Sequence, residues 1–517
     1  MKICDCTLRD GGYYTNWDFS NNLVVQYLKA LNKIEAIKFI ELGYRSAPQE
    51  IYLGEYFYCP DYVLKNAKIY APNKSFVIML NSKSTSLEDL DYLLKPCIGI
   101  VDLVRVAVNP SQMAHSIELS QAIKKMGFKV AFNIMYMSQW STDSNFLSSL
   151  SKLDGFVDII YLVDSYGSVL PDDVESAVKN IRNNTSIRLG FHGHNNLEMA
   201  LINSIKAFEC GVEFIDTTIT GMGRGAGNLK TELLLTYLSK STEEPIRLGS
   251  LTEVISQFEN LQNSYKWGTN LPYMISGAFS LPQAEVMEWL SKKRYATSEI
   301  VSTLQAKSRK RTLLELHQFG KNILKNTYSS IVVIGGGQSV NESILALNQI
   351  LKNNNILPIF AGFRNYSKIS LEREHLVTIS GQEFIKCTEL CSNVQFISEA
   401  SPRKMELYLP GQFHDSSFEL PNSHFSHKDS LLSIALSIAI ELCIKEVFLI
   451  GFDGYPNQGH NIISKENQTI IDECVQESLL SISSLKPTLY NNIPVKSIFS
   501  IVSESNKDEN NSISSMS

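Results

Sequence analysis

Short apolar segments recur at regular intervals through the first half of the chain, and a stretch long enough for a helix follows each one. Most of these segments show little alternation of apolar and polar residues, which is typical of parallel strands that helices cover on both faces. Eight such units within about 245 residues match the size of a closed (β/α)8 TIM barrel, and eight consecutive units favour closure over an open, doubly wound sheet. The predicted strands are Ile3–Thr7, Ala36–Leu42, Ser75–Leu80, Val101–Val108, Lys129–Met135, Val157–Val163, Ile187–Phe191 and Glu213–Thr217.

The pattern changes twice after this barrel, which we place at residues 1–248. Apolar positions then recur at helical spacing, and we predict a helical extension over 249–327. From Ile331, short β-rich runs alternate with helices again, which predicts a smaller Rossmann-like α/β domain over 328–500. Residues 501–517 are polar, so we expect a disordered tail there. Examples of the helices expected in the extension are Leu251–Asn263, Leu281–Ser291 and Ser298–Leu304.

The charge and composition of the chain argue against several classes of binding partner. The net charge is −6 and there is no basic stripe, which argues against binding to nucleic acid or to an anionic membrane surface. No apolar run reaches membrane-spanning length, and the N-terminus has no apolar signal region. The nine cysteines form no CxxC pair, which is typical of a cytoplasmic protein with reduced thiols.

Reactive side chains collect where the predicted barrel strands end, which is where such barrels place their active sites. His192 and His194 flank one residue at the end of the seventh strand, so both imidazoles lie on one side of the chain. Asp10 follows the first strand, which barrel closure brings close to the seventh. Two nitrogens, one carboxylate and open positions suit a divalent metal that binds substrate oxygens, whereas a histidine pair alone could be structural.

Further polar residues at the strand ends are candidates for catalysis and substrate binding. Arg9 lies beside the predicted metal aspartate, and its guanidinium can bind a carboxylate or neutralise a developing enolate. A salt bridge in the barrel rim is the alternative. Glu41 is a candidate for proton transfer, and Asn133, Asp164 and Ser165 are candidates, with Arg9, for binding substrate.

Three motifs carry a resemblance to a known superfamily: T-L-R-D-G-G at 7–12, H-G-H-N-N at 192–196 and D-T-T-I-T-G-M-G-R-G-A-G-N at 216–228. Together they resemble the DRE-TIM metallolyases, which include HMG-CoA lyase-like enzymes, aldolases and Claisen-type synthases. Over roughly residues 1–300 the chain looks most like the 4-hydroxy-2-oxovalerate-type aldolases.

The resemblance implies roles for individual residues. It makes Asp10, His192 and His194 the ligands of Mn²⁺ or Mg²⁺, and Asn228 matches a position that also binds metal in some branches. Arg9 matches the arginine that stabilises the pyruvate enolate.

One position departs from the aldolase pattern. Those aldolases carry a histidine, their catalytic base, three residues after the metal aspartate, and this chain has Tyr13 there. The other histidine of the barrel region, His115, falls in the helix after the fourth strand. Proton transfer therefore falls to Tyr13, to Glu41 or to a metal-bound water.

The second domain carries two glycine-containing turns after predicted strands. Gly335, Gly336 and Gly337 precede Ser339 and a helix, so backbone N–H groups there can approach a phosphate. With the turn around Asp453 they resemble nucleotide-binding domains related to 6-hydroxymethylpterin diphosphokinase and bacterial sialyltransferases, which implies a nucleotide or nucleotide-sugar ligand. A plain tight turn is the alternative, because the GxGxxG spacing and a Walker lysine are missing.

These features predict a metal-dependent aldolase or lyase that makes or breaks a carbon–carbon bond between a 2-oxoacid, such as pyruvate, and an aldehyde. We expect a cytoplasmic homo-oligomer, and the fusion suggests a role in sugar or surface-glycan (polysaccharide) biosynthesis. A Claisen-type synthase using an acyl-CoA is one alternative, although no basic cluster for the CoA phosphates is evident at the mouth. The others are a regulatory barrel without catalysis and a C-terminal glycosyl or nucleotidyl transferase with a regulatory barrel.

Overall fold

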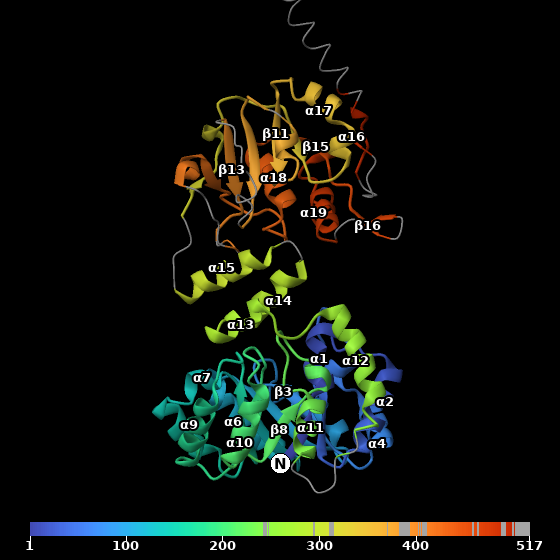
Figure 1. Cartoon of the computed structure of the whole chain (residues 1–517), viewed down its shortest axis with the longest axis vertical. Helices are drawn as coiled ribbons and strands as arrows, with labels where there is room; N and C mark the ends of the chain where they lie inside the picture. Colours follow the sequence, from blue (N-terminus) through green and yellow to red (C-terminus); the bar gives the residue numbers. More distant parts are fainter. Residues whose placement is uncertain are drawn as a thin grey trace, which may run out of the picture. The chain divides into compact units, whose positions relative to one another are not determined.

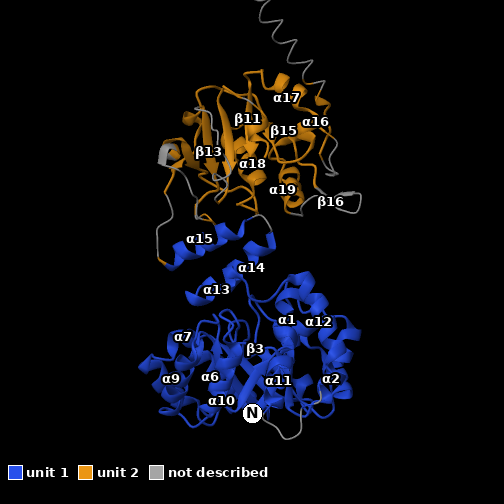
Figure 2. Ribbon diagram, in the orientation of Figure 1, with its two compact units in different colours: residues 1–308 blue, residues 309–517 orange. Residues whose placement is uncertain are grey.

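The chain, seen in a computed structural model, divides into two compact units, Met1–Ser308 and Arg309–Ser517, and each is described by itself (Figure 2). The predicted tail lies outside the described residues except for Ile501. The structure describes all residues except 241–245, 247, 293–294, 310–314, 370, 382–392, 402, 404, 406–410, 458–459, 463–464, 487–492, 499–500 and 502–517.

Eight parallel strands close into a barrel in chain order, which confirms the predicted fold (Figure 1). The ring closes because β1 pairs with both β2 and β8. Each strand overlaps its predicted segment, and the interior is filled by a cluster of buried side chains that includes Cys4, Cys6 and Tyr161. The strands are β1 (Lys2–Asp5), β2 (Ile37–Tyr44), β3 (Ser75–Asn81), β4 (Val101–Val108), β5 (Lys129–Ile134), β6 (Ile159–Asp164), β7 (Arg188–Gly193) and β8 (Phe214–Thr217).

The first strand is shorter than predicted, because α1 already begins at Thr7. The Asp5 carboxylate accepts hydrogen bonds from both the backbone N–H and the hydroxyl of Thr7, and this contact stabilises the turn into the helix. Asp10 consequently lies in the first turn of a helix.

Helices connect the barrel strands and cover their outer faces (Figure 1). They are α1 (Thr7–Thr15), α2 (Asn21–Asn32), α3 (Glu55–Tyr58), α4 (Asp61–Tyr70), α5 (Leu90–Leu94), α6 (Met113–Lys125), α7 (Met137–Trp140), α8 (Ser144–Ser149), α9 (Pro171–Arg182), α10 (Ala200–Glu209) and α11 (Thr231–Ser239). Four further helices follow in the same unit, and α13 lies within the predicted helical extension, outside the three helices named as examples. They are α12 (Thr252–Tyr265), α13 (Leu271–Ala278), α14 (Gln283–Lys292) and α15 (Thr297–Ser308).

The second unit contains an eight-stranded sheet in the order β18-β15-β10-β11-β12-β13-β14-β9, and all its pairs are parallel. Its strands are β9 (His317–Gln318), β10 (Ser330–Ile334), β11 (Ile356–Ala361), β12 (His375–Ile379), β13 (Val394–Ser398), β14 (Ser417–Glu419), β15 (Glu446–Ile450) and β18 (Ser481–Ser484). Its helices are α16 (Ser339–Glu342), α17 (Ile344–Ile350), α18 (Leu431–Glu441) and α19 (Lys465–Gln476), and β16 (Tyr455–Asn457) pairs with β17 (His460–Ile462). Within the described part of the chain, no helix has the length and apolar character that crossing a membrane requires.

Candidate active site

The three side chains predicted as metal ligands lie at the carboxyl end of the barrel strands, and their ligand atoms do not all lie within 4.8 Å of one another. His192 belongs to β7, His194 follows that strand, and Asp10 comes from α1. All three are at most 6% exposed. Asp10 Oδ2 lies 3.4 Å from His192 Nε2, and the centroids of the two imidazole rings are 5.1 Å apart.

The Nδ1 atoms of both histidines face oxygens that can only accept a hydrogen bond. His192 Nδ1 donates to Oδ2 of Asp216 over 2.9 Å, and His194 Nδ1 donates to the backbone oxygen of Asp164 over 2.8 Å. These partners assign the proton to Nδ1, so each Nε2 carries a lone pair. Burial lowers the pKa of His194 to about 3, which keeps its ring neutral. Fixing the ring through Nδ1 is typical of metal-ligating histidines.

Asn228 completes this group of donors. Its Nδ2 donates to Oδ2 of Asp10 over 2.7 Å, and its backbone forms an isolated bridge with His194. Its Oδ1 is buried and has no hydrogen-bond partner among the described residues. A buried oxygen without a partner, next to a carboxylate and two imidazoles, is the environment in which a cation would be stabilised.

Two buried arginines connect the carboxylates of the site. Arg9 contacts Oδ1 of Asp10 through Nη1 and donates from Nε to Oε2 of Glu41 over 2.8 Å. Arg105 binds both oxygens of Asp216, at 2.9 and 2.6 Å, and its Nη1 lies 3.3 Å from Oε1 of Glu41. Both carboxylate oxygens of Glu41 thus face guanidinium groups, a geometry that orients Arg9 and leaves Glu41 poorly placed to accept a substrate proton.

The arginines also determine the ionisation of the acids. Burial alone would raise the pKa of Asp10 and of Asp216. At Asp10 the Arg9 guanidinium outweighs that effect only together with the two histidines and Asn228, and the pKa is lowered; at Asp216 the Arg105 guanidinium together with His192 lowers the pKa to about 2. Both carboxylates are therefore anions at neutral pH, as metal binding and support of His192 require.

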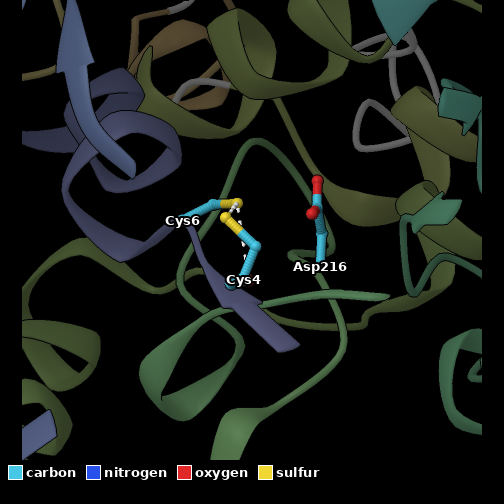
Figure 3. A group of neighbouring side chains, drawn as sticks. All are labelled: Cys4, Cys6 and Asp216. Atoms are coloured by element: carbon cyan, nitrogen blue, oxygen red, sulfur yellow. Dashed lines mark hydrogen bonds between the residues drawn. The ribbon is translucent and has the colours of Figure 1, made fainter. Parts of the chain in front are cut away.

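Asp216 has a role that the sequence analysis missed, although it begins the third motif. It lies beside the interior cysteines Cys4 and Cys6 (Figure 3), and it accepts hydrogen bonds from Arg105. Cys4, Cys6 and Asp216 are the only group of His, Cys, Asp or Glu in the described residues whose ligand atoms all lie within 4.8 Å of one another. Burial raises the pKa of both thiols, and Arg105 lies 3.5 Å from the Cys6 sulfur. The Arg105 guanidinium thus already supplies the positive charge in this cluster. Its Asp216 carboxylate accepts the hydrogen bond that orients His192.

Tyr13 lies at the open mouth of the barrel. Its side chain is 37% exposed, and its hydroxyl is 3.2 Å from that of the buried Tyr44. The Arg224 guanidinium carbon lies 5.7 Å from the centre of the Tyr13 ring. Tyr13 is therefore accessible to a substrate.

The predicted substrate-binding residues differ in what their side chains contact. Asn133 is buried, and its Oδ1 has no hydrogen-bond partner among the described residues. Asp164 accepts from the backbone N–H groups of Ser168 and Val169, and burial raises its pKa to about 7. Ser165 Oγ accepts from the backbone N–H of Tyr136 over 2.8 Å. Asn133 is thus free to contact a ligand, whereas the other two stabilise the loop after β6.

The barrel is similar in sequence to known proteins. The HMGL-like family model matches residues 106–257. A 4-hydroxy-2-oxovalerate aldolase of Geobacillus genomosp. 3 is 31% identical over 247 residues, which cover 46% of this chain and 71% of that protein. The solved N-terminal domain of a "putative aldolase" from Bacteroides vulgatus is 49% identical, with a TM-score of 0.55 and coverage of 58% of this chain and 99% of that one. The chain belongs to the HMGL-like family of the DRE-TIM superfamily.

Family membership confirms the predicted resemblance and makes the barrel a metal-dependent aldolase or lyase domain. An oxaloacetate decarboxylase of Mycobacterium tuberculosis is also similar, at 29% identity over 248 residues that cover 46% of this chain and 70% of that protein. The residues present fit a divalent metal, because the Nδ1 atoms of both histidines are bound to acceptors, Asp10 is ionised, and the buried Oδ1 of Asn228 has no hydrogen-bond partner among the described residues.

The second unit brings its two glycine-containing turns together on the neighbouring strands β10 and β15. The Gly335 N–H donates to the Ile450 oxygen, and the Gly337 N–H donates to the Gly451 oxygen. The Asp453 carboxylate accepts from the Ser339 N–H over 2.7 Å, at the start of α16. An acidic side chain therefore occupies an N–H group that a phosphate would need, and nucleotide binding at Gly335, Gly336 and Gly337 stays a prediction.

Proposed function

We propose that the barrel is a divalent-metal-dependent aldolase that joins or cleaves pyruvate, or a similar 2-oxoacid, and an aldehyde through an enolate. The observation that carries the proposal is the pair of imidazoles with both Nδ1 protons fixed and both Nε2 lone pairs free, beside Asp10 and the unpartnered oxygen of Asn228. We assign Asp10, His192 and His194 as metal ligands, with Asn228 as a further donor. The relatives named as aldolases support this choice.

The metal, Mn²⁺ or Mg²⁺, would supply Lewis-acid stabilisation of the 2-oxoacid oxygens as negative charge develops. Arg9 places its guanidinium beside Asp10, where it stabilises the same charge, and Glu41 fixes its orientation. In cleavage, a base removes the proton of the C4 hydroxyl, the C3–C4 bond breaks, and its electron pair remains on the enolate as the aldehyde leaves. Protonation at C3 then yields pyruvate.

Exchange of the pyruvate methyl protons in D2O tests the function without requiring knowledge of the aldehyde. The full chain, loaded with Mg²⁺ or Mn²⁺, is expected to exchange these protons, since the enolate forms before any carbon–carbon bond. Proton NMR follows the loss of the methyl signal in Mg²⁺, and deuterium content by mass spectrometry serves with paramagnetic Mn²⁺. Excess EDTA should stop the exchange. Exchange that neither metal supports would contradict the proposal.

Tyr13 is the base that the geometry favours, because its hydroxyl is at the mouth while Glu41 is enclosed by arginines. We expect Tyr13→Phe to lower kcat for the condensation of pyruvate with an aldehyde by about 100-fold or more, the lower range for loss of a general acid or base. Tyr44→Phe is the matched control, since it removes the hydroxyl that contacts Tyr13 but lies in the interior. A Tyr13→Phe protein with unchanged kcat would move the role to a water.

A role for this reaction in sugar or surface-glycan synthesis, with a nucleotide or nucleotide-sugar bound by the second unit, rests only on the fusion of the two units. It remains a subsidiary part of the proposal.

A further inference from the structure

The loop after β8 presents a guanidinium at the mouth of the barrel. Its path is fixed by backbone hydrogen bonds from Asn228 to Gly221 and from Gly268 to Gly225. Gly225 has φ +65°, a conformation that L side chains rarely adopt, so this turn favours glycine. The adjacent Arg224 side chain reaches toward the Tyr13 ring.

Arg224 is a guanidinium of the mouth for which the described residues supply no anion; Arg45, after β2, binds backbone oxygens instead. Arg9 and Arg105 share the carboxylates of Asp10, Glu41 and Asp216 between them. No carboxylate of the described residues lies within 4 Å of Arg224, and its Nε is buried without a hydrogen-bond partner in that part of the chain.

A partly buried cation with an unused donor is stabilised by an anion, and the planar fork of arginine favours a carboxylate or a phosphate.

Tyrosines near this guanidinium add hydroxyl donors. The rings of Tyr136 and Tyr166, after β5 and β6, are 5.3 Å apart. Tyr136 has φ +64°, an uncommon conformation for a tyrosine, and the Ser165 hydroxyl fixes it by accepting from its N–H. Tyr166 lies close enough to Arg224 for its ionisation to respond to that charge. The rim thus suits a polar, acidic ligand.

We propose that Arg224 binds an anionic group, a carboxylate or a phosphate, on the aldehyde partner of the reaction. This inference rests on the proposed aldolase function. The base that takes the C4 hydroxyl proton must face the aldehyde carbon, and Tyr13 is the proposed base. Because Arg224 lies beside the Tyr13 ring, the anion that it binds belongs to the aldehyde. The 2-oxoacid has Arg9 near the metal ligands for its own charge. The second substrate is therefore an acidic aldehyde.

The proposed role of Arg224 can be tested with the metal-loaded full chain by measuring the condensation of pyruvate with pairs of acidic and neutral aldehydes. Each pair has the same carbon skeleton: glyoxylate against glycolaldehyde, and glyceraldehyde 3-phosphate against glyceraldehyde. The native chain should prefer the acidic member of at least one pair, and the pair preferred distinguishes carboxylate from phosphate. Arg224→Gln should lower the ratio of kcat/KM, acidic over neutral, by about 100-fold, the loss expected for a hydrogen-bonded charge. Arg224→Lys should recover part of it.

The control variant and the contrary outcomes distinguish a failure of this inference from a failure of the proposed aldolase function. Lys206→Gln removes an equal charge on α10, away from the mouth, and should leave the ratio as it is. A native chain that exchanges pyruvate protons but shows no acidic preference would overturn the inference and leave the aldolase intact. A rise in KM for pyruvate of similar size in Arg224→Gln would move the arginine to the 2-oxoacid and overturn it too. Absence of exchange would instead remove the function itself.

Discussion

Replacing His194 by alanine should abolish the metal-dependent exchange of pyruvate protons, and replacing His192 should do the same. Each Nε2 offers its lone pair to the proposed metal, and no other described histidine lies near Asp10 to replace it. Lewis-acid stabilisation contributes several kcal/mol, so its loss should lower the exchange rate by at least about 1,000-fold. Mn²⁺ bound per chain, measured by electron paramagnetic resonance after equilibrium dialysis, should fall in parallel.

His115→Ala is the matched control, because it is the remaining histidine of the barrel region. It lies on α6 with a side chain 40% exposed, and its Nε2 faces the backbone oxygen of Thr85. This variant should keep both metal and exchange. A His194→Ala protein that folds, binds Mn²⁺ as tightly as the native chain and exchanges at the native rate would contradict the ligand assignment.

The barrel could be predicted from the sequence because its strands are covered on both faces. That burial leaves nearly continuous apolar runs, as in Phe76–Leu80, and eight of them in series leave few alternatives to closure. The proposed ligands could be predicted because they lie within short motifs at strand ends, where the fold brings different strands together.

The helix α1 was not predicted, and its Gly11 and Gly12 are residues that disfavour a helix. In the structure they serve close packing: a Cβ at Gly12 would lie 2.1 Å from the Trp17 ring, and one at Gly11 would lie 2.6 Å from the Met222 sulfur. Glycine inside a helix costs about 1 kcal/mol, and here the packing of neighbouring side chains outweighs that preference. Local propensity cannot reveal such a contact.

The ion pairs among the buried charged residues next to the proposed metal site could not be predicted from the sequence either. Glu41, Arg105 and Asp216 come from β2, β4 and β8, and only closure of the barrel brings them together. A charge at an interior position of an otherwise apolar strand, such as Arg105 in V-D-L-V-R-V-A-V, is the available indication, because such a charge is buried only when paired. It indicates that a partner exists without identifying it.

Asp216→Asn should therefore damage both stability and metal binding. Arg105 is fully buried and would lose the anion that binds it through two hydrogen bonds, which should lower the free energy of unfolding by about 3 kcal/mol. His192 would lose the carboxylate that fixes its Nδ1 proton, which should weaken Mn²⁺ binding by about 10- to 100-fold. Urea unfolding followed by tryptophan fluorescence reports on the barrel unit, because all four tryptophans, Trp17, Trp140, Trp267 and Trp289, lie in it.

A double variant separates the two effects. Adding Arg105→Met to Asp216→Asn removes the buried charge that has lost its two hydrogen bonds to a carboxylate, while Glu41 keeps its contact with Arg9. Because replacing a buried ion pair by groups of similar volume is often close to neutral, the double variant should recover most of the lost stability. Its Mn²⁺ affinity should stay low, since His192 still lacks a carboxylate partner. Recovery of both quantities would mean that Asp216 acts on the metal site only through the charge of Arg105, whereas native affinity in Asp216→Asn alone would remove its role in orienting the histidine.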